Sequence, residues 1–310
     1  MPRVLITGGA GFVGTNLVAH LAGTGEYSIV VLDDESLGSG RHLAEFDIDF
    51  LKASILDETA LDRALQNVEI VVHLAADTRV VDSITEPAHN FRTNVIGTFT
   101  LLQRARAAGV KRFVNASTGG AILGEVQAPI HEDLPARPTS PYGASKLAAE
   151  GYCSAFREAY GLSTVSLRFS NIYGERSFHK GSVVAHFFKA ILKGDDLVIY
   201  GDGSQIRDYL YAGDLVQGIE KAMRSDASGA IQLASGRPTT LNALIELIRQ
   251  TVGSGYEVRV RKVPFRTGEI HTTWCKIDRA AGLLAFKPDT PLEEGLRRTW
   301  SWFLSAYKYT

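Results

Sequence analysis

Residues 140–146, SPYGASK, place a tyrosine and a lysine four positions apart. In a helix this spacing puts Tyr142 and Lys146 on one face, with Ser140 as the N-cap and Pro141 in the first helical position. A tyrosine with a pKa of about 10 is a poor base at neutral pH, but a nearby ammonium favours the phenolate. The segment therefore predicts a proton-transfer pair, for which a solvated helix face is the alternative.

A pair of hydroxyl groups follows an apolar run in FVNASTGG, residues 113–120. Ser117 and Thr118 end that run, and residues just past the carboxyl ends of parallel strands line the ligand crevice of a doubly wound sheet. We expect Thr118 to hydrogen-bond a reacting hydroxyl group. An ordinary turn or helix cap is the alternative for either side chain.

The elements that hold these residues begin with VLITGGAGFVGTNL, residues 4–17. An unbroken apolar run leads into a turn that contains Gly8, Gly11 and Gly14, and a helical pattern starts at Phe12. Strand, glycine turn and helix in this order form a dinucleotide site, because the helix N-terminus attracts a pyrophosphate. The glycine spacing is G-x-x-G-x-x-G rather than the usual G-x-G-x-x-G. A glycine turn without a ligand is the alternative.

The next apolar run, residues 29–32, ends at Asp33, about 20 residues beyond the glycine turn. A carboxylate there accepts a hydrogen bond from a ribose 2'-hydroxyl and repels a 2'-phosphate, which predicts NAD rather than NADP. Asp34 is a second candidate for this contact, and a structural turn aspartate is the alternative for Asp33.

Short apolar runs alternate with helical patterns through the first half, which is typical of an α/β fold with a doubly wound parallel sheet. The expected strands cover residues 4–6, 29–32, 70–74, 112–115 and 164–169, and the expected helices cover residues 12–23, 58–66, 93–108 and 141–160. Later helices are predicted over residues 183–192 and from a Thr240 cap to Gly253. We expect a domain of residues 1–170 and a smaller, segmented domain of residues 171–310, with residues 205–235 returning to the first.

The chain of 310 residues has 45% hydrophobic residues, 22% charged residues and a formal net charge of -1. This balance gives no reason to expect a nucleic-acid or membrane partner. Its two cysteines, Cys153 and Cys275, indicate a reducing compartment. The first apolar run begins three residues from Met1, and no run approaches the roughly 18 apolar residues of a membrane span. We therefore expect a soluble cytoplasmic protein without a metal.

Together these motifs resemble the extended short-chain dehydrogenases/reductases, and within them the nucleotide-sugar epimerases and dehydratases. The similar segments are TGGAGFVG, Asp33, VVHLAA, NVIGT, NASTGGAILGE, SPYGASK, LRFSNIYGER, YGDGSQIRDYLYAGDL and RTGEI, which together span nearly the whole chain. The glycine spacing at residues 8–14 is the spacing of this family. The resemblance implies a Rossmann domain that binds NAD and a C-terminal domain that binds a nucleotide sugar.

The resemblance also implies roles for individual residues. The implied catalytic residues are Thr118, Tyr142 and Lys146. The implied NAD-binding residues are Gly8, Gly11, Phe12, Val13, Asp33, Asp34, Ile55, Leu74, Ala75, Ala76, Asn94, Tyr142 and Lys146. The implied substrate-binding residues are Thr118, Asn171, Arg176, Arg207 and Arg266, because guanidinium groups clamp phosphates. As alternatives, Arg207 pairs with Asp208 or Asp214 on the surface, and Asn171 is a strand-end turn residue.

Three departures from the family pattern limit what carries over. A common tyrosine of the family is Leu123 here, and an expected aspartate is Ser54, which leaves Ile55 and Asp57 as candidates beside the adenine. Family dehydratases carry an Asp-Glu pair where this chain has Gly119 and Gly120. Dehydration is therefore not expected.

The resemblance implies an NAD-dependent nucleotide-sugar 4-epimerase that acts on a UDP-hexose through a transient 4-keto sugar. A 4-ketoreductase and a non-catalytic NAD-binding sensor are the alternatives. A homodimer is expected through the helices near residues 93–108 and 141–160, although Ala148, Tyr152 and Phe156 fit core packing equally well.

The loop GERSFHKGS, residues 174–182, raises the question of which sugar is bound. Arg176, His179 and Lys180 precede a predicted helix N-terminus, and this combination would suit a sugar carboxylate. UDP-glucuronate is therefore an alternative to a neutral UDP-hexose such as UDP-glucose.

Overall fold

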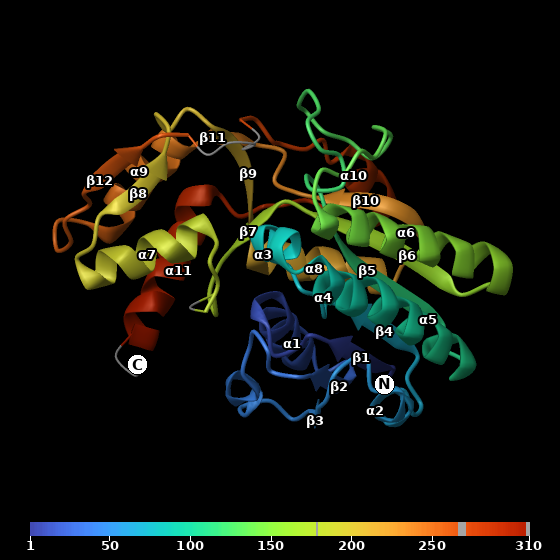
Figure 1. Ribbon diagram of the computed structural model, residues 1–310. Coiled ribbons are helices and arrows are strands. Elements are labelled where there is room, and N and C mark those ends of the chain that lie inside the picture. Colours follow the sequence, from blue (N-terminus) through green and yellow to red (C-terminus); the bar gives the residue numbers. More distant parts are fainter. Residues whose placement is uncertain (178, 266–270, 308–310) are drawn as a thin grey trace.

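Seven parallel strands form the main sheet of the computed structural model, which describes residues 1–177, 179–265 and 271–307 (Figure 1). In spatial order the strands are β10 (Gly229–Leu233), β6 (Ser163–Phe169), β5 (Arg112–Thr118), β4 (Ile70–His73), β1 (Arg3–Thr7), β2 (Ser28–Asp33) and β3 (Asp49–Lys52). The first three strands are added on one side of β1, and the chain then crosses to β4 on its other side. In a doubly wound sheet the ligand crevice opens at the carboxyl ends of the two strands at this switch point. The expected doubly wound fold is confirmed.

Alternate residues of β1 face two separate apolar cores. Val4 and Ile6 pack with the helices on one face, whereas Leu5 packs with those on the other. The first face carries α1 (Phe12–Thr24), α8 (Ala212–Met223) and α10 (Asp278–Leu284). The second carries α2 (Glu58–Ala64), α5 (Gly97–Ala107) and α6 (Pro141–Tyr160). Burial on both faces explains why this strand has no polar alternation.

Helix α6 has the bounds that the sequence predicts. Ser140 Oγ accepts a hydrogen bond from the Gly143 N–H group at 3.1 Å, and Pro141 opens the helix. Gly161, with φ of 71°, ends it in the left-handed region that favours glycine.

The helix expected over residues 93–108 is divided in the structure. Residues Arg92–Ile96 form a π-helical turn, η2, directly before α5. Two short helices that the sequence did not predict, α3 (Val80–Thr85) and α4 (Pro87–Phe91), precede it. A π turn inserts one residue into the helical repeat, so a continuous apolar period does not reveal it.

The smaller part of the structure has its own apolar core (upper left in Figure 1). It includes the sheet of β11 (Pro238–Thr240), β9 (Ile206–Tyr211) and β7 (Asn171–Tyr173), and the pair β12 (Val260–Val263) and β8 (Leu197–Tyr200). The helices α7 (Val183–Lys193), α9 (Leu241–Val252) and α11 (Leu292–Tyr307) pack there, with Phe188 beside Trp300 and Phe303. After β9 the chain returns to the main sheet through α8 and β10. The domain boundary near residue 170 stays a prediction.

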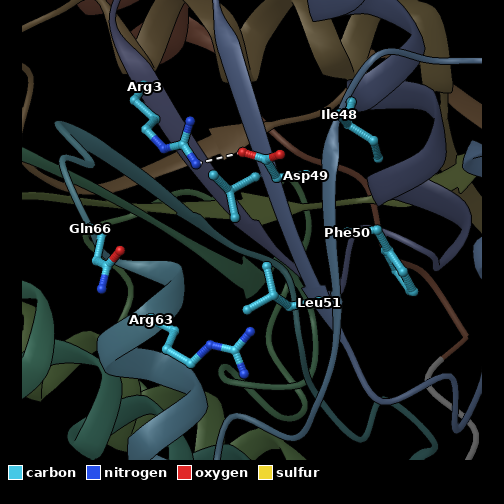
Figure 2. Close-up of a pocket in the computed structure, with 8 residues that line it drawn as sticks. Arg3, Ile48, Asp49, Phe50, Leu51, Arg63 and Gln66 are labelled. Carbon is cyan, nitrogen blue, oxygen red and sulfur yellow. Dashed lines mark hydrogen bonds and ion pairs between the residues drawn. The ribbon is translucent and has the colours of Figure 1, made fainter.

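Figure 2 shows a surface hollow that lies away from the expected crevice. Arg3, at the start of β1, donates to Asp49, at the start of β3, and Phe50 and Arg63 lie nearby. These are the amino ends of the strands, whereas ligands of doubly wound sheets bind at the carboxyl ends. Separately, none of the helices within the described ranges is long and apolar enough to cross a bilayer.

Candidate active site

Tyr142 and Thr118 meet at the carboxyl end of β5. Tyr142 lies in the first turn of α6, where its N–H group donates to Ser83 Oγ at 3.2 Å. Burial raises the pKa of Tyr142 to about 12, a side-chain hydrogen bond with Thr118 lowers it, and the charge of Asp77 raises it. From the sequence, Lys146 is expected to lower this pKa. In the chain alone burial dominates, so the phenol is protonated at neutral pH.

Lys146 is buried one helical turn beyond Tyr142. Its Nζ donates to the Ala116 carbonyl oxygen at 3.0 Å, which joins α6 to β5 two residues before Thr118. Burial lowers the pKa of Lys146 to about 8, while the nearby Cys153 and Glu150 raise it. The ammonium is therefore held inside the protein close to the carboxyl end of β5.

A buried ion pair supports this arrangement from the next turn of α6. Arg168 Nη2 lies 2.8 Å from Glu150 Oε2, and both side chains are almost fully buried. Ser117 Oγ donates to Glu150 Oε1 at 2.6 Å, so β5, β6 and α6 are joined at one carboxylate. Breaking a buried pair by removing one partner is strongly destabilising, which makes Glu150 and Arg168 positioning residues.

The glycine turn forms a cradle with no room for side chains. Gly8 has φ of 72°, and a Cβ there would lie 2.6 Å from the Ala75 backbone nitrogen. At Gly14 a Cβ would lie 2.3 Å from the Gly8 carbonyl oxygen. Gly11 is the N-cap of α1 and contributes no side chain to cap the helix. The N–H groups of the first turn are therefore available to an anion, as the NAD pyrophosphate requires.

Asp33 and Asp34 differ in their surroundings. Asp33 is buried, and its two carboxylate oxygens accept the N–H groups of Ala10, at 2.9 Å, and Glu35, at 2.7 Å. Burial raises its pKa, and these hydrogen bonds lower it. Asp34 is exposed and accepts the Ser36 N–H group. Asp33, beside the glycine turn, is therefore the better placed of the two to contact a ribose.

Asn94 has its amide fully engaged by the protein. Its Nδ2 donates to the Asp77 carbonyl oxygen at 2.9 Å and to Ser145 Oγ at 3.0 Å, and its Oδ1 accepts the Asp77 N–H group at 2.8 Å. The family resemblance implies that Asn94 is one of the NAD contacts. Because both amide hydrogens are used, we propose that it positions the loop after β4 against α6 instead.

His73 is a buried residue for which the sequence suggests no functional role. Its Nδ1 lies 2.8 Å from Thr7 Oγ1 and its Nε2 lies 2.9 Å from Thr98 Oγ1. Thr98 donates its own hydrogen to the Asn94 carbonyl oxygen, so it accepts from His73 Nε2. Burial, followed by the charge of Lys146, lowers the pKa of His73 to about 3. A neutral histidine thus connects β1, β4 and α5 beneath the site. It stands in the apolar run VVHL, where the pattern indicates only a strand.

The remaining predicted cofactor residues follow the carboxyl ends of β1, β3 and β4. Phe12 and Val13 open α1, and Leu74, Ala75 and Ala76 follow β4. Ile55 is buried against Gly97. Asp57, the other candidate beside the adenine, caps α2 by accepting the Ala60 N–H group, which accounts for it without a ligand.

The expected substrate residues lie on adjacent strands. Asn171 of β7 is paired with Tyr209 of β9, two residues after Arg207, so Asn171 and Arg207 share a face of that sheet. Asn171 Nδ2 donates to the Asp208 carbonyl oxygen, and Arg207 Nη1 donates to the His271 carbonyl oxygen at 3.0 Å. His271 in turn lines a surface hollow with residues 125–128, which follow β5. Arg266 lies outside the described residues.

Arg176 lies on the cofactor side of the molecule. Its Nη2 is 3.7 Å from Glu45, and it has a positive φ of 62°. The structure therefore does not bring Arg176 together with Arg207 and Asn171 through any contact among the described residues.

The first glycine after Thr118 leaves no space for an acidic side chain. A Cβ at Gly119 would lie 2.9 Å from Gln232 Oε1 and 3.2 Å from the Phe169 carbonyl oxygen. This packing agrees with the sequence argument against dehydration. Within residues 1–177, 179–265 and 271–307, no group of three or more acidic, histidine or cysteine side chains is arranged to hold a metal ion.

The buried Lys146 makes stability depend on pH. Because its folded pKa is about 8, against 10.5 normally, the unfolded chain binds more protons between these values, and stability rises with pH through that window. We expect the ligand-free Lys146→Met variant to be more stable than wild type at pH 7, by on the order of 3 kcal/mol before the lost hydrogen bond is counted.

Urea unfolding from pH 7 to pH 10.5 checks this expectation. The difference between Lys146→Met and wild type should shrink as the pH rises above 8. The exposed Lys262→Met should show no such trend. If the difference in unfolding free energy between Lys146→Met and wild type is constant with pH, the pKa of Lys146 is not lowered by burial as assigned.

Comparison with known proteins places this geometry in a family. Residues 4–234 match the model of the "NAD dependent epimerase/dehydratase family". A putative UDP-glucose 4-epimerase of Methanocaldococcus jannaschii is 34% identical over 304 residues, which cover 96% of this chain and 97% of that protein.

Two solved structures have the same fold. The UDP-glucose 4-epimerase of Thermotoga maritima, crystallised with UDP-glucose, superposes with a TM-score of 0.93 at 36% identity, covering 98% of this chain and 99% of that one. The UDP-glucuronic acid 4-epimerase of Bacillus cereus, in complex with UDP-glucuronic acid and NAD, gives a TM-score of 0.90 at 27% identity, covering 98% and 100%. The expected family and cofactor are confirmed: this chain belongs to the NAD-dependent epimerase/dehydratase family.

Proposed function

We propose that the protein interconverts the C4 epimers of a UDP-hexose. The observation that carries the proposal is the contact of Tyr142 with Thr118 at the carboxyl end of β5, with the Lys146 ammonium one turn along the same helix. Relatives over nearly the whole chain are named 4-epimerases, which supports the same activity.

The residues have complementary tasks in this proposal. Tyr142 Oη accepts the proton of the C4 hydroxyl group and later returns it, while Thr118 hydrogen-bonds the same region. Bound NAD supplies the hydride acceptor and donor, and its positive ring offsets the burial that raises the Tyr142 pKa. Asn171 and Arg207 hold the diphosphate, which anchors the substrate while the sugar presents either face.

A neutral hexose fits the described residues better than a uronic acid. Arg176, His179 and Lys180 of loop 174–182 do not converge on one point. Arg176 lies by Glu45, the His179 ring stacks on His42, and Lys180 lies over Phe12. We therefore favour UDP-glucose and UDP-galactose as substrates, with the uronate pair as the second candidate because a relative of known structure binds UDP-glucuronic acid.

The 4-ketoreductase alternative uses the same tyrosine, lysine and threonine. The two activities differ in cofactor exchange, because a net reductase exchanges its cofactor in every turnover and an epimerase does not. NAD released on denaturation of the purified protein separates the two: near-stoichiometric NAD supports the epimerase and an empty site supports the reductase. The cytoplasmic location stays a prediction from the two free cysteines.

We also propose that two copies of the chain form a dimer. Exposed apolar side chains lie on α3, α4 and α6, and these three helices contact one another. The exposed fractions are 68% for Val81, 61% for Ile84, 55% for Phe91 and 40% for Tyr152. Such a patch indicates an interface, and a second copy buries it symmetrically.

Turnover of UDP-glucose tests the assigned base. Tyr142→Phe should lower kcat at least 100-fold, because a general base typically contributes that much, and should leave UDP affinity within about threefold of wild type. Tyr160→Phe, exposed at the far end of α6, is the matched control. The proposed activity requires that wild type forms UDP-galactose from UDP-glucose. A Tyr142→Phe variant that keeps a tenth of wild-type kcat would refute the role of Tyr142 as the base.

Cofactor choice tests Asp33. Asp33→Asn keeps an oxygen for the Ala10 N–H group but removes the charge that repels a 2'-phosphate. The ratio of NADP to NAD affinity of the stripped protein should rise at least tenfold, whereas Asp34→Asn should leave it unchanged. The reverse pattern would assign the ribose contact to Asp34.

Solution mass tests the dimer. Phe91→Glu places a charge in the apolar patch and should convert the dimer to a monomer with little loss of protomer stability, because Phe91 is exposed. Leu283→Glu, at 52% exposure on α10, is outside the patch and should stay dimeric. Light scattering after gel filtration gives the masses, and a monomeric wild type would end the proposal.

A further inference from the structure

Asp77 is a buried carboxylate in the loop that follows β4. Asn90 Nδ2 donates to Asp77 Oδ2 at 3.2 Å, and the Arg79 N–H group donates to Oδ1 at 3.4 Å. The Arg79 guanidinium lies 4.0 Å from Oδ1, but it is 62% exposed and pairs with Asp82 at 2.8 Å. Because an exposed cation is well solvated, it compensates the buried negative charge of Asp77 only weakly.

Two hydrogen-bonded routes connect Asp77 to Tyr142. In the first, Asn94 Nδ2 donates to the Asp77 carbonyl oxygen and to Ser145 Oγ. Ser145 Oγ in turn donates to the Tyr142 carbonyl oxygen at 2.8 Å. In the second, the Asp77 carboxylate binds the N-cap residue of α3, and Ser83 of that helix accepts the Tyr142 N–H group. The carboxylate and the tyrosine are therefore fixed relative to each other where the neighbouring strands β4 and β5 end.

The charge of Asp77 reaches Tyr142, whose pKa it raises. The other ionisable side chains of the surrounding elements are engaged with other groups or lie at or near the surface. Those engaged inside the protein are Lys146, Glu150, Cys153, Arg168 and His73. Those at or near the surface are Arg79, Asp82, Glu86, His89, Arg92 and Arg137. Within the described part of the chain, the charge that acts on the Tyr142 phenol is thus that of Asp77.

We propose that Asp77 is a positioning residue for Tyr142, and that its buried negative charge makes the tyrosine a stronger base. The proposal rests on the proposed epimerisation, in which one hydroxyl group takes a proton and later returns it. The NAD ring and the Lys146 ammonium both favour the phenolate, and too much positive charge would leave an anion too weak to accept a proton from an alcohol. Asp77 offsets part of that positive charge.

Titration of the Tyr142 phenol tests the proposal without turnover. The ultraviolet absorbance of tyrosinate is followed with pH in full-length protein saturated with NAD, and the titration of the same protein carrying Tyr142→Phe is subtracted. Asp77→Asn keeps the shape of the side chain and an acceptor for the Arg79 N–H group, and it should lower the Tyr142 pKa by about half a pH unit or more. Asp82→Asn removes a more exposed carboxylate, on α3, and should leave that pKa unchanged.

The pH profile of UDP-glucose turnover gives a second readout. In Asp77→Asn the acidic limb of kcat should move to lower pH by the same amount as the phenol pKa, and kcat on the plateau should fall because the base is weaker. Asp77→Ser keeps a hydroxyl acceptor without the charge, and it should show the same changes. It replaces Asp77→Asn if that variant does not fold.

Three outcomes would overturn the proposal. An unchanged Tyr142 pKa in the uncharged variants would show that Asp77 does not act on the phenol. A fall in kcat without a change in the pKa would make Asp77 a purely structural residue. An equal change in Asp82→Asn would assign the effect to surface charge in general. Because the titration requires no epimerisation, the inference and the proposed activity can fail independently.

Discussion

Burial of the Lys146 ammonium is the constraint on which the site depends. A charge in the interior is stable only with polar partners, and Lys146 has the Ala116 carbonyl oxygen and the nearby charge of Glu150. Glu150 is itself held by Arg168 and Ser117. These contacts fix α6 against β5 and β6, and the position of Tyr142 beside Thr118 follows from that packing. The buried charge of Lys146 thus lowers the stability of the fold, and it is held close to the carboxyl end of β5.

The same burial keeps Tyr142 inactive in the chain alone. With its pKa raised to about 12, the phenol holds its proton at neutral pH despite the hydrogen bond with Thr118. A working base needs positive charge beyond that provided by the surrounding residues, and the NAD ring carries one. In the proposed mechanism the base strength of Tyr142 therefore depends on cofactor binding.

The sequence predicted those parts of the fold that local patterns determine. Helix α6 has its cap, proline and glycine within the segment, and buried strands such as β1 are unbroken apolar runs. Strand β3 was missed because it is a short, mostly exposed edge strand, and η2 because a π turn has no apolar signature. The partners of His73 and the engaged amide of Asn94 arise from contacts between distant segments, so no spacing in the sequence could show them.

The described residues of the segment after β7, 174–177 and 179–182, bear on the choice between epimerase and reductase. A reductase releases its cofactor in every cycle, so contacts that must break for release slow its turnover. An epimerase regenerates its cofactor in place, and the same contacts carry no kinetic penalty. Here Asn16, Glu45 and Phe12 of the cofactor side lie against Glu175, Arg176 and Lys180 of this segment, which follows the strand that carries Asn171. An arrangement that joins the cofactor side of the molecule to the substrate side suits a reaction in which only the sugar enters and leaves.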